Sequence, residues 1–259
     1  MNRVDLNCDM GESFGAWSIG DDGGVMPYVS SINVACGFHA GDPSVMRTTV
    51  TLAAMHDIAI GAHPGLPDLI GFGRREMAVG ASEVYDMVVY QVGALQGIVK
   101  AVADVPLRHV KPHGALYNMA AVRDELADAI ARAVRDVDAS LALVGLSGSA
   151  LLRAGTACGL RVASEVFADR NYMPDGSLVP RTRPDALVTD VDAAVARAVT
   201  MATRGSATAV DGTTIALAAD TICIHGDGAH AATFARRIRA ALTDAHIAVL
   251  PVGSTPLAD

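Results

Sequence analysis

The sequence has few of the features that mark membrane, nucleic-acid-binding or disulfide-rich proteins. Only 4% of its 259 residues are aromatic, and no apolar run approaches the ~18 residues of a membrane helix. The net charge is −8 and basic clusters are limited to Arg74-Arg75 and Arg236-Arg237, so we expect neither nucleic acid nor a membrane as a partner. The cysteines form no CxxC pair and are expected to be reduced thiols; they are Cys8, Cys36, Cys158 and Cys223.

Motifs for nucleotide and nucleophile chemistry are also missing. The sequence contains no GxxxxGKS/T, no GxGxxG after a strand, no HExxH and no GxSxG. These absences argue against a phosphate-loop site, a dinucleotide-binding βαβ unit, a zinc protease helix and an α/β-hydrolase elbow, respectively. The N-terminal stretch MNRVDLNCD resembles neither a secretory signal nor a transit peptide, and we therefore expect a cytoplasmic protein.

Apolar residues are abundant, at 51% of the chain, and they form short runs that alternate with helical patterns. That order is typical of a parallel α/β sheet. Asp42 followed by Pro43 predicts the start of a helix over 42–56, and a second pattern predicts a helix over 82–103. The candidate strands are 4–9, 32–35, 58–63, 107–113, 141–146, 160–166, 221–225 and 247–251.

We therefore predict an α/β fold, namely a TIM-like (β/α) barrel with seven or eight repeats in one domain over residues 1–259. The glycine-rich stretch 11–31 does not support a full helix, so one repeat is expected to be degenerate. Gly159 and Gly205 are placed to end the helices before them. An open doubly wound sheet is the alternative, and in both architectures ligands bind beyond the carboxyl ends of the strands.

Several predicted strands end in an ionisable residue followed closely by glycine, as in LNCDMGE (6–12), IAIGAHPG (58–65), VKPHGALYN (110–118) and ICIHGDG (222–228). Because strand side chains alternate between faces, one face of each strand is aliphatic and the other is polar or very small. Buried charges without partners are costly, so we expect the polar faces to meet at one ligand site. The residues predicted to be catalytic are Asp9, Glu12, His39, His63, Lys111 and His113.

Two loops are expected to form walls of the site. The stretch 61–75 ends in Arg74 and Arg75, whose guanidinium groups suit a carboxylate. The stretch 165–181 is long for a βα connection, and loops of that length often act as lids or partner surfaces. The residues predicted to bind substrate are Asn7, Arg74, Arg75, Glu165, Arg170 and His225.

Five motifs in this order resemble the lactam-utilisation family, which is understood as the A subunit of the bacterial ATP-dependent 5-oxoprolinase. They are LNCDMGESFG (6–15), NVACGFHAGDP (33–43), GAHPGLPD with GFGRR (61–75), VKPHGALYN (110–118) and SEVFADRNYMPDGSLVPR (164–181). The resemblance covers essentially the whole chain. It implies a barrel related to the sugar-deacetylase fold, and opening of 5-oxo-L-proline to L-glutamate. It also implies ATP with Mg²⁺ as co-substrate and two partner subunits, B and C.

The residues themselves leave the catalytic roles open. We expect Asp9 or Glu12 to be the base and His63 or His113 the proton donor, with Lys111 binding developing negative charge. A first alternative is a metal-dependent deacetylase or amidohydrolase acting without ATP, in which Asp9, His39 and His63 would hold zinc; whether a metal is bound stays open. A second alternative is a non-catalytic subunit that captures the lactam and passes it to partners.

Overall fold

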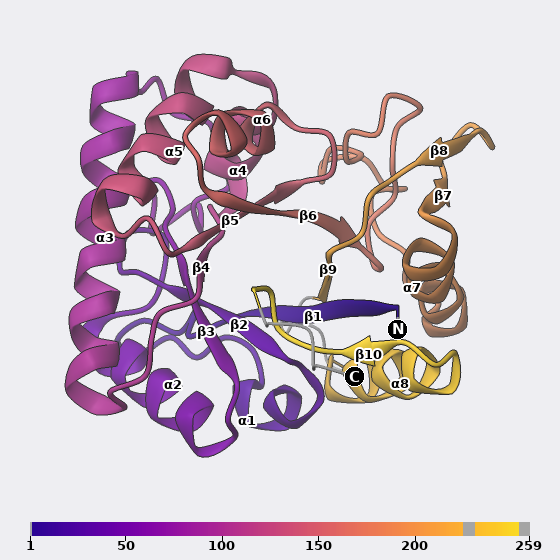
Figure 1. Ribbon diagram of the computed structural model, residues 1–259, viewed down its shortest axis with the longest axis horizontal. Helices are drawn as coiled ribbons and strands as arrows, with labels where there is room; N and C mark the ends of the chain where they lie inside the picture. The colour runs from indigo at the N-terminus through magenta and orange to yellow at the C-terminus, as the bar shows by residue number, and fades with distance from the viewer. Residues whose placement is uncertain (1, 225–230, 254–259) are drawn as a thin grey trace.

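The computed structural model describes residues 2–224 and 231–253. Within these ranges seven parallel strands form a closed barrel, because β1 pairs with both β2 and β9 while the others pair in sequence. Figure 1 shows the strands in the centre with the helices outside them. The barrel strands are β1 (Arg3–Met10), β2 (Ser31–Ala35), β3 (Ala59–His63), β4 (His109–Val110), β5 (Ala142–Leu146), β6 (Arg161–Phe167) and β9 (Thr221–Ile224). The prediction of a (β/α) barrel with seven or eight repeats is confirmed, with seven.

The helices begin and end at the predicted signals. The Asp42 carboxylate accepts hydrogen bonds from the backbone at the start of α2, and Gly205 ends α7 with a left-handed φ of 60°. The first repeat is degenerate, as expected, with only α1 (Asp22–Val25) and the 3-10 turn η1 (Met26–Tyr28) after β1. The longer helices are α2 (Pro43–Met55), α3 (Ala81–Val102), α4 (Gly114–Val122), α5 (Asp124–Val137), α6 (Ala150–Ala157), α7 (Val191–Arg204) and α8 (Ala231–Asp244).

Two strand predictions differ from the structure, and one hairpin was not predicted. The eighth candidate, β10 (Ala248–Val249), pairs with the first residues of β1 and is not part of the closed ring. The fourth strand has two residues, since prolines at 106 and 112 have no N–H to donate. An antiparallel hairpin of β7 (Ser206–Thr208) and β8 (Thr214–Ala216) was not predicted, although an Asp-Gly pair at 211–212 marks its turn.

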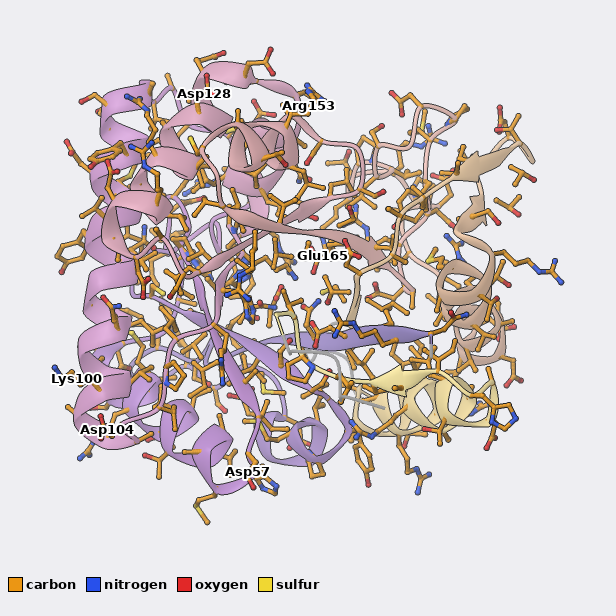
Figure 2. All side chains as sticks on the ribbon, in the orientation of Figure 1. Asp57, Lys100, Asp104, Asp128, Arg153 and Glu165 are labelled. Atoms are coloured by element: carbon orange, nitrogen blue, oxygen red, sulfur yellow. The ribbon has the colours of Figure 1, made fainter. Side chains whose placement is uncertain are left out.

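Charged side chains separate into an outer set and an inner set. Figure 2 shows Lys100, Asp128 and Arg153 on the outer helices, whereas Glu165 lies in the interior. The relative exposure of Glu165 is 0%, so the barrel encloses a carboxylate that an aliphatic core would exclude. No helix within the described ranges is long and apolar enough to cross a membrane.

The barrel interior depends on small residues opposite large polar ones. Gly61 in β3 pairs with His109 in β4, and a Cβ added to Gly61 would lie 2.1 Å from His109 Nε2. The imidazole therefore occupies the space that a side chain on β3 would fill. Aliphatic residues such as Ile60 and Ala62 point the other way, into the layer beneath the helices.

This packing predicts that Gly61→Ala destabilises the fold by about 1–3 kcal/mol, because the added methyl group must displace a buried ring. Gly93→Ala is the matched control: it lies within α3, and an added Cβ meets no atom within 4 Å. The control should be neutral or more stable by up to about 1 kcal/mol. Urea denaturation measures both, and equal midpoints for the two variants would contradict the packing argument.

Candidate active site

The lower end of the polar interior is organised by Asp5. Its carboxylate accepts hydrogen bonds from the hydroxyl groups of Ser30 (2.6 Å), Ser31 (2.8 and 2.9 Å) and Thr221 (2.6 Å). Burial raises the pKa of Asp5 to about 6, even though these hydroxyl groups act in the opposite direction. The deepest layer of the interior thus holds a carboxyl group whose pKa is raised toward neutrality.

Lys111 is the centre of the next layer. Its ammonium nitrogen Nζ lies 2.8 Å from Glu165 Oε1 and 3.0 Å from Asp9 Oδ1. Burial by itself lowers the pKa of Lys111, but the attraction of Asp9 and Glu165 outweighs it and raises the pKa well above its ordinary value. Lys111 therefore stays a cation between two carboxylates.

A directional chain of hydrogen bonds connects these layers. His109 Nε2 donates to Asn33 Oδ1 (2.8 Å), because an amide oxygen can only accept. Asn33 Nδ2 then donates to Asn7 Oδ1 (2.7 Å), and Asn7 Nδ2 donates to Thr221 Oγ1 (2.7 Å). Burial, with the positive charge of Lys111, lowers the pKa of His109 to about 3, which keeps the ring neutral. This chain orients the amides that also contact Asp9 and Glu165.

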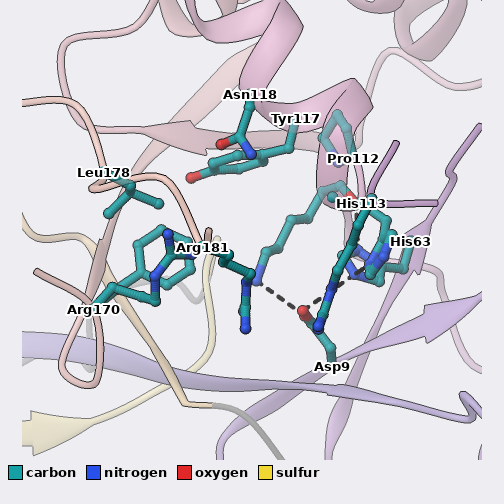
Figure 3. Close-up of a pocket in the computed structure, with 13 residues that line it drawn as sticks. Asp9, His63, Pro112, His113, Tyr117, Asn118, Arg170, Leu178 and Arg181 are labelled. Atoms are coloured by element: carbon teal, nitrogen blue, oxygen red, sulfur yellow. Dashed lines mark hydrogen bonds and ion pairs between the residues drawn. The ribbon is translucent and has the colours of Figure 1, made fainter. Parts of the chain in front are cut away.

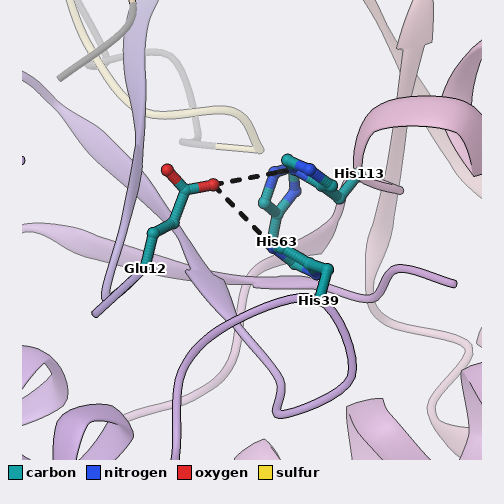
Figure 4. A group of neighbouring side chains, drawn as sticks. All are labelled: Glu12, His39, His63 and His113. Carbon is teal, nitrogen blue, oxygen red and sulfur yellow. Dashed lines mark hydrogen bonds and ion pairs between the residues drawn. The ribbon is translucent and has the colours of Figure 1, made fainter. Parts of the chain in front are cut away.

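Four ionisable side chains form a separate group near the rim, which we call the imidazole cluster. It consists of Glu12, His39, His63 and His113, all buried, with potential ligand atoms within 4.8 Å of one another. Figure 4 shows the three rings facing the Glu12 carboxylate. Burial, followed by the charge of neighbouring histidines, lowers the pKa values of His39 and His113 well below the ordinary value. Burial thus favours the neutral form of these two rings, which lie beside the Glu12 side chain.

The neighbouring loop is held by a buried glutamine that the sequence pattern did not single out. Gln91 of α3 accepts a hydrogen bond from Gly65 N (2.9 Å) and donates to Gly65 O (3.0 Å). An added Cβ on Gly65 would lie 2.4 Å from His39 Nδ1. The loop after β3 is thus fixed directly against the His39 ring.

A pocket opens above Lys111 and beside the imidazole cluster. Asp9, His63, Lys111 and His113 line it, together with Tyr117 and Phe167. Figure 3 shows Asp9 beside His63 and His113 at one side of the pocket. Lys111 Nζ lies 5.6 Å from the centre of the Phe167 ring. Some lining residues are absent from the predicted catalytic and substrate-binding sets: Pro112, Gly114, Tyr117, Asn118, Phe167, Leu178 and Arg181. The last three lie in the stretch 165–181 that was expected to form a wall of the site.

The structure places most of the predicted substrate-binding residues in the pocket or directly beneath it. Arg74 and Arg170 line the pocket. Arg75 points elsewhere: it forms an ion pair with Asp68 and is not among the lining residues. Asn7 and Glu165 lie deeper, where they contact one another and Lys111. His225 lies outside the described residues.

The fold and the site define a closed (β/α) barrel protein with carboxylates, a lysine and imidazoles grouped beyond the carboxyl ends of its strands. The chain belongs to the LamB/YcsF family, whose sequence profile matches residues 4–256. The resemblance seen in the five sequence motifs is thereby confirmed.

Relatives of known name cover nearly the whole chain. It is 64% identical over 249 residues to the A subunit of 5-oxoprolinase from Tolumonas auensis, covering 96% of this chain and 99% of that protein. It is 58% identical over 252 residues to the A subunit of 5-oxoprolinase from Bacillus subtilis, covering 97% and 98%.

Solved structures show the same fold. A lactam utilization protein from Thermus thermophilus superposes with a TM-score of 0.90 at 48% identity, over 96% of this chain and 99% of that chain. The catalytic domain of a peptidoglycan N-acetylglucosamine deacetylase from Eubacterium rectale has a TM-score of 0.51 at 11% identity, over 98% and 90%. The latter similarity concerns the fold alone, and it confirms the predicted likeness to the deacetylase barrel in fold.

The raised pKa of Asp5 predicts a specific pH dependence of stability. Between its ordinary value of 3.8 and about 6, the folded protein holds a proton on Asp5 that the unfolded chain releases. Stability from this group is therefore present at low pH and is lost as pH rises through 6. From pH 5 to pH 8 the wild type should lose about 1–2 kcal/mol more free energy of unfolding than Asp5→Asn, which cannot titrate. Urea denaturation at both pH values measures this, and parallel profiles would contradict it.

Proposed function

We propose that this chain is the A subunit of a 5-oxoprolinase, which opens the lactam of 5-oxo-L-proline to L-glutamate with ATP hydrolysis and acts with subunits B and C. The observation that carries the proposal is the identity of 58–64% to proteins named as the A subunit of 5-oxoprolinase over nearly their full length. The word subunit in those names supports partner chains. Four free cysteines support a reducing, cytoplasmic setting.

The lactam ring is an unstrained amide, so its hydrolysis needs activation of the carbonyl group, a base for water and an acid for the ring nitrogen. Coupling to ATP supplies activation if the amide oxygen is phosphorylated. Asp9 is the base in this proposal. It lines the pocket, and its Oδ2 lies 3.2 Å from His63 Nε2. Glu12 is a weaker candidate because it is not among the pocket-lining residues.

Lys111 acts in this proposal as a fixed positive charge. Its Nζ already contacts Asp9 and Glu165, so it keeps Asp9 in place while its field favours negative charge that develops above it. In the metal-free protein, His63 is placed to supply the proton to the ring nitrogen, because it lines the same pocket beside Asp9. His113 also lines the pocket, but burial lowers its pKa.

Arginines that line the pocket bind the negatively charged groups in this proposal. Arg74, Arg170 and Arg181 all line it, and guanidinium groups suit both the substrate carboxylate and a phosphoryl group. Because the sequence has no phosphate-loop motif, we assign no ATP-Mg²⁺ site to a particular segment of this chain.

Reconstitution tests the proposal directly. The purified chain alone should release little phosphate from ATP with 5-oxoproline, and adding subunits B and C should give 5-oxoproline-dependent release. Asp9→Asn in the same mixture should lower the rate by at least about 100-fold, as expected for loss of a general base. Full activity of the isolated chain would contradict the division of labour, and a normal rate for Asp9→Asn would contradict its role.

Adjacent arginines provide a second test. Arg74→Met removes a guanidinium group that lines the pocket, so the KM for 5-oxoproline should rise by about 10–100-fold. Arg75→Met is the matched control, since its partner is Asp68 outside the pocket. Its KM should stay unchanged in the reconstituted enzyme. Equal effects of the two substitutions would remove Arg74 from substrate binding.

One observation favours a second function, a metal-dependent deacetylase or amidohydrolase that works without ATP. The sequence suggested Asp9, His39 and His63 as zinc ligands. In the structure, the imidazole cluster groups these two histidines with Glu12 and His113. Measuring L-glutamate formation with and without ATP separates the two functions, because a metal-dependent amidohydrolase would open the lactam equally well when ATP is left out.

A further inference from the structure

Two rings of the imidazole cluster form hydrogen bonds with backbone oxygens. His63 Nδ1 lies 2.7 Å from the backbone oxygen of Lys111, and His113 Nε2 lies 2.8 Å from that of Phe72. A carbonyl oxygen only accepts, so each of these nitrogens carries the proton of its ring. In a neutral ring that donates through one nitrogen, the second nitrogen carries a lone pair.

These two lone pairs point at each other. His63 Nε2 and His113 Nδ1 are 2.9 Å apart, and Asp9 Oδ2 lies 3.2 Å from His63 Nε2. With both rings neutral, these acceptors repel one another unless a positive species lies between or beside them. Both rings therefore have the form of metal-binding histidines, in which a backbone carbonyl fixes the remote N–H and turns the other nitrogen toward the ion.

His39 gives an independent indication. Its relative exposure is 0%, and neither ring nitrogen has a hydrogen-bond partner within the described part of the chain. Its ring stacks on that of His113, with centroids 3.8 Å apart and planes inclined by 1°. Leaving a buried polar group without a partner costs about 1–3 kcal/mol, a cost that a ligand on its nitrogen would remove.

The Glu12 carboxylate stands at a distance suited to an ion. Its Oε1 lies 3.8 Å from His39 Nε2 and 3.6 Å from His113 Nδ1, both beyond hydrogen-bonding distance. Two atoms that bind one ion at about 2.0–2.2 Å each are commonly separated by such distances. Glu12 and the histidines come from four separate chain segments, so the convergence is a product of the fold.

We propose that Glu12, His39, His63 and His113 bind one divalent transition-metal ion at the wall of the pocket. Three imidazoles and one carboxylate favour zinc, cobalt or nickel over magnesium and calcium, which prefer oxygen ligands. Lys111 does not prevent this, because its charge is already in contact with Asp9 and Glu165. Such an ion would supply a Lewis acid beside the substrate carbonyl group.

Metal binding is measured without any substrate, so its outcome is independent of the proposed reaction. Tag-free full-length protein, freed of metal with a chelator, is titrated with Zn²⁺ by calorimetry and with Co²⁺ by visible absorption. We expect one equivalent per chain, and Mg²⁺ in about 1,000-fold excess should not displace it. Metal should also raise the melting temperature of the wild type.

The matched variants are His39→Gln, His113→Gln and, as control, the exposed surface substitution His56→Gln. Each cluster variant should bind Zn²⁺ at least about 100-fold more weakly and lose the rise in melting temperature, while the control keeps both. Circular dichroism checks that the variants fold, and Glu12→Gln replaces any that does not. Stoichiometric binding unchanged in the cluster variants, or no binding by the wild type, would overturn the proposal; a shared proton would then join His63 and His113.

Discussion

The interior of this barrel depends on the ammonium group of Lys111. A buried cation is tolerated only when opposite charges and hydrogen-bond acceptors surround it, and Asp9, Glu165 and Asn7 meet that need at 3.0, 2.8 and 3.3 Å. Asp9 and Asn7 come from β1, and Glu165 comes from β6. The ring of strands therefore closes around a charge network where ordinary barrels place layers of Val, Ile and Leu, and this network fixes Asp9 at the pocket.

Glycines make the rest of the arrangement possible, for a steric reason. A Cβ on Gly73, whose φ is +62°, would lie 2.7 Å from His39 Cβ and 2.9 Å from His113 Cδ2. Gly61 makes the same room for His109. The same holds for glycines that follow strand-end histidines: an added Cβ would lie 2.4 Å from His39 Nδ1 at Gly65, and 2.6 Å from the backbone oxygen of Gly73 at Gly114. The pattern thus combines a polar side chain at the strand end with a backbone close enough to hold it.

Sequence patterns predicted the barrel, the helix signals and the meeting of Asp9, Lys111 and His113, because alternation along strands and parallel topology determine which side chains share a rim. They did not distinguish Arg74, which lines the pocket, from Arg75, which does not. Arg75 forms an ion pair with Asp68, seven positions earlier, and this contact is visible only in the folded chain. Asn33 and Gln91 were also missed. Each is a single polar residue in an apolar segment, and its partner is visible only after the chain folds.

The layers of the interior differ in charge, and their order has a consequence for chemistry. Asp5 lies deepest, Lys111 with Asp9 and Glu165 lies above it, and the imidazole cluster stands beside the pocket. The Asp9 side chain contacts both upper groups, through Oδ1 to Lys111 and Oδ2 toward His63. A charge change on either side therefore acts directly on this carboxylate. Such a shared contact would couple the charge network around Lys111 to whatever occupies the imidazole cluster.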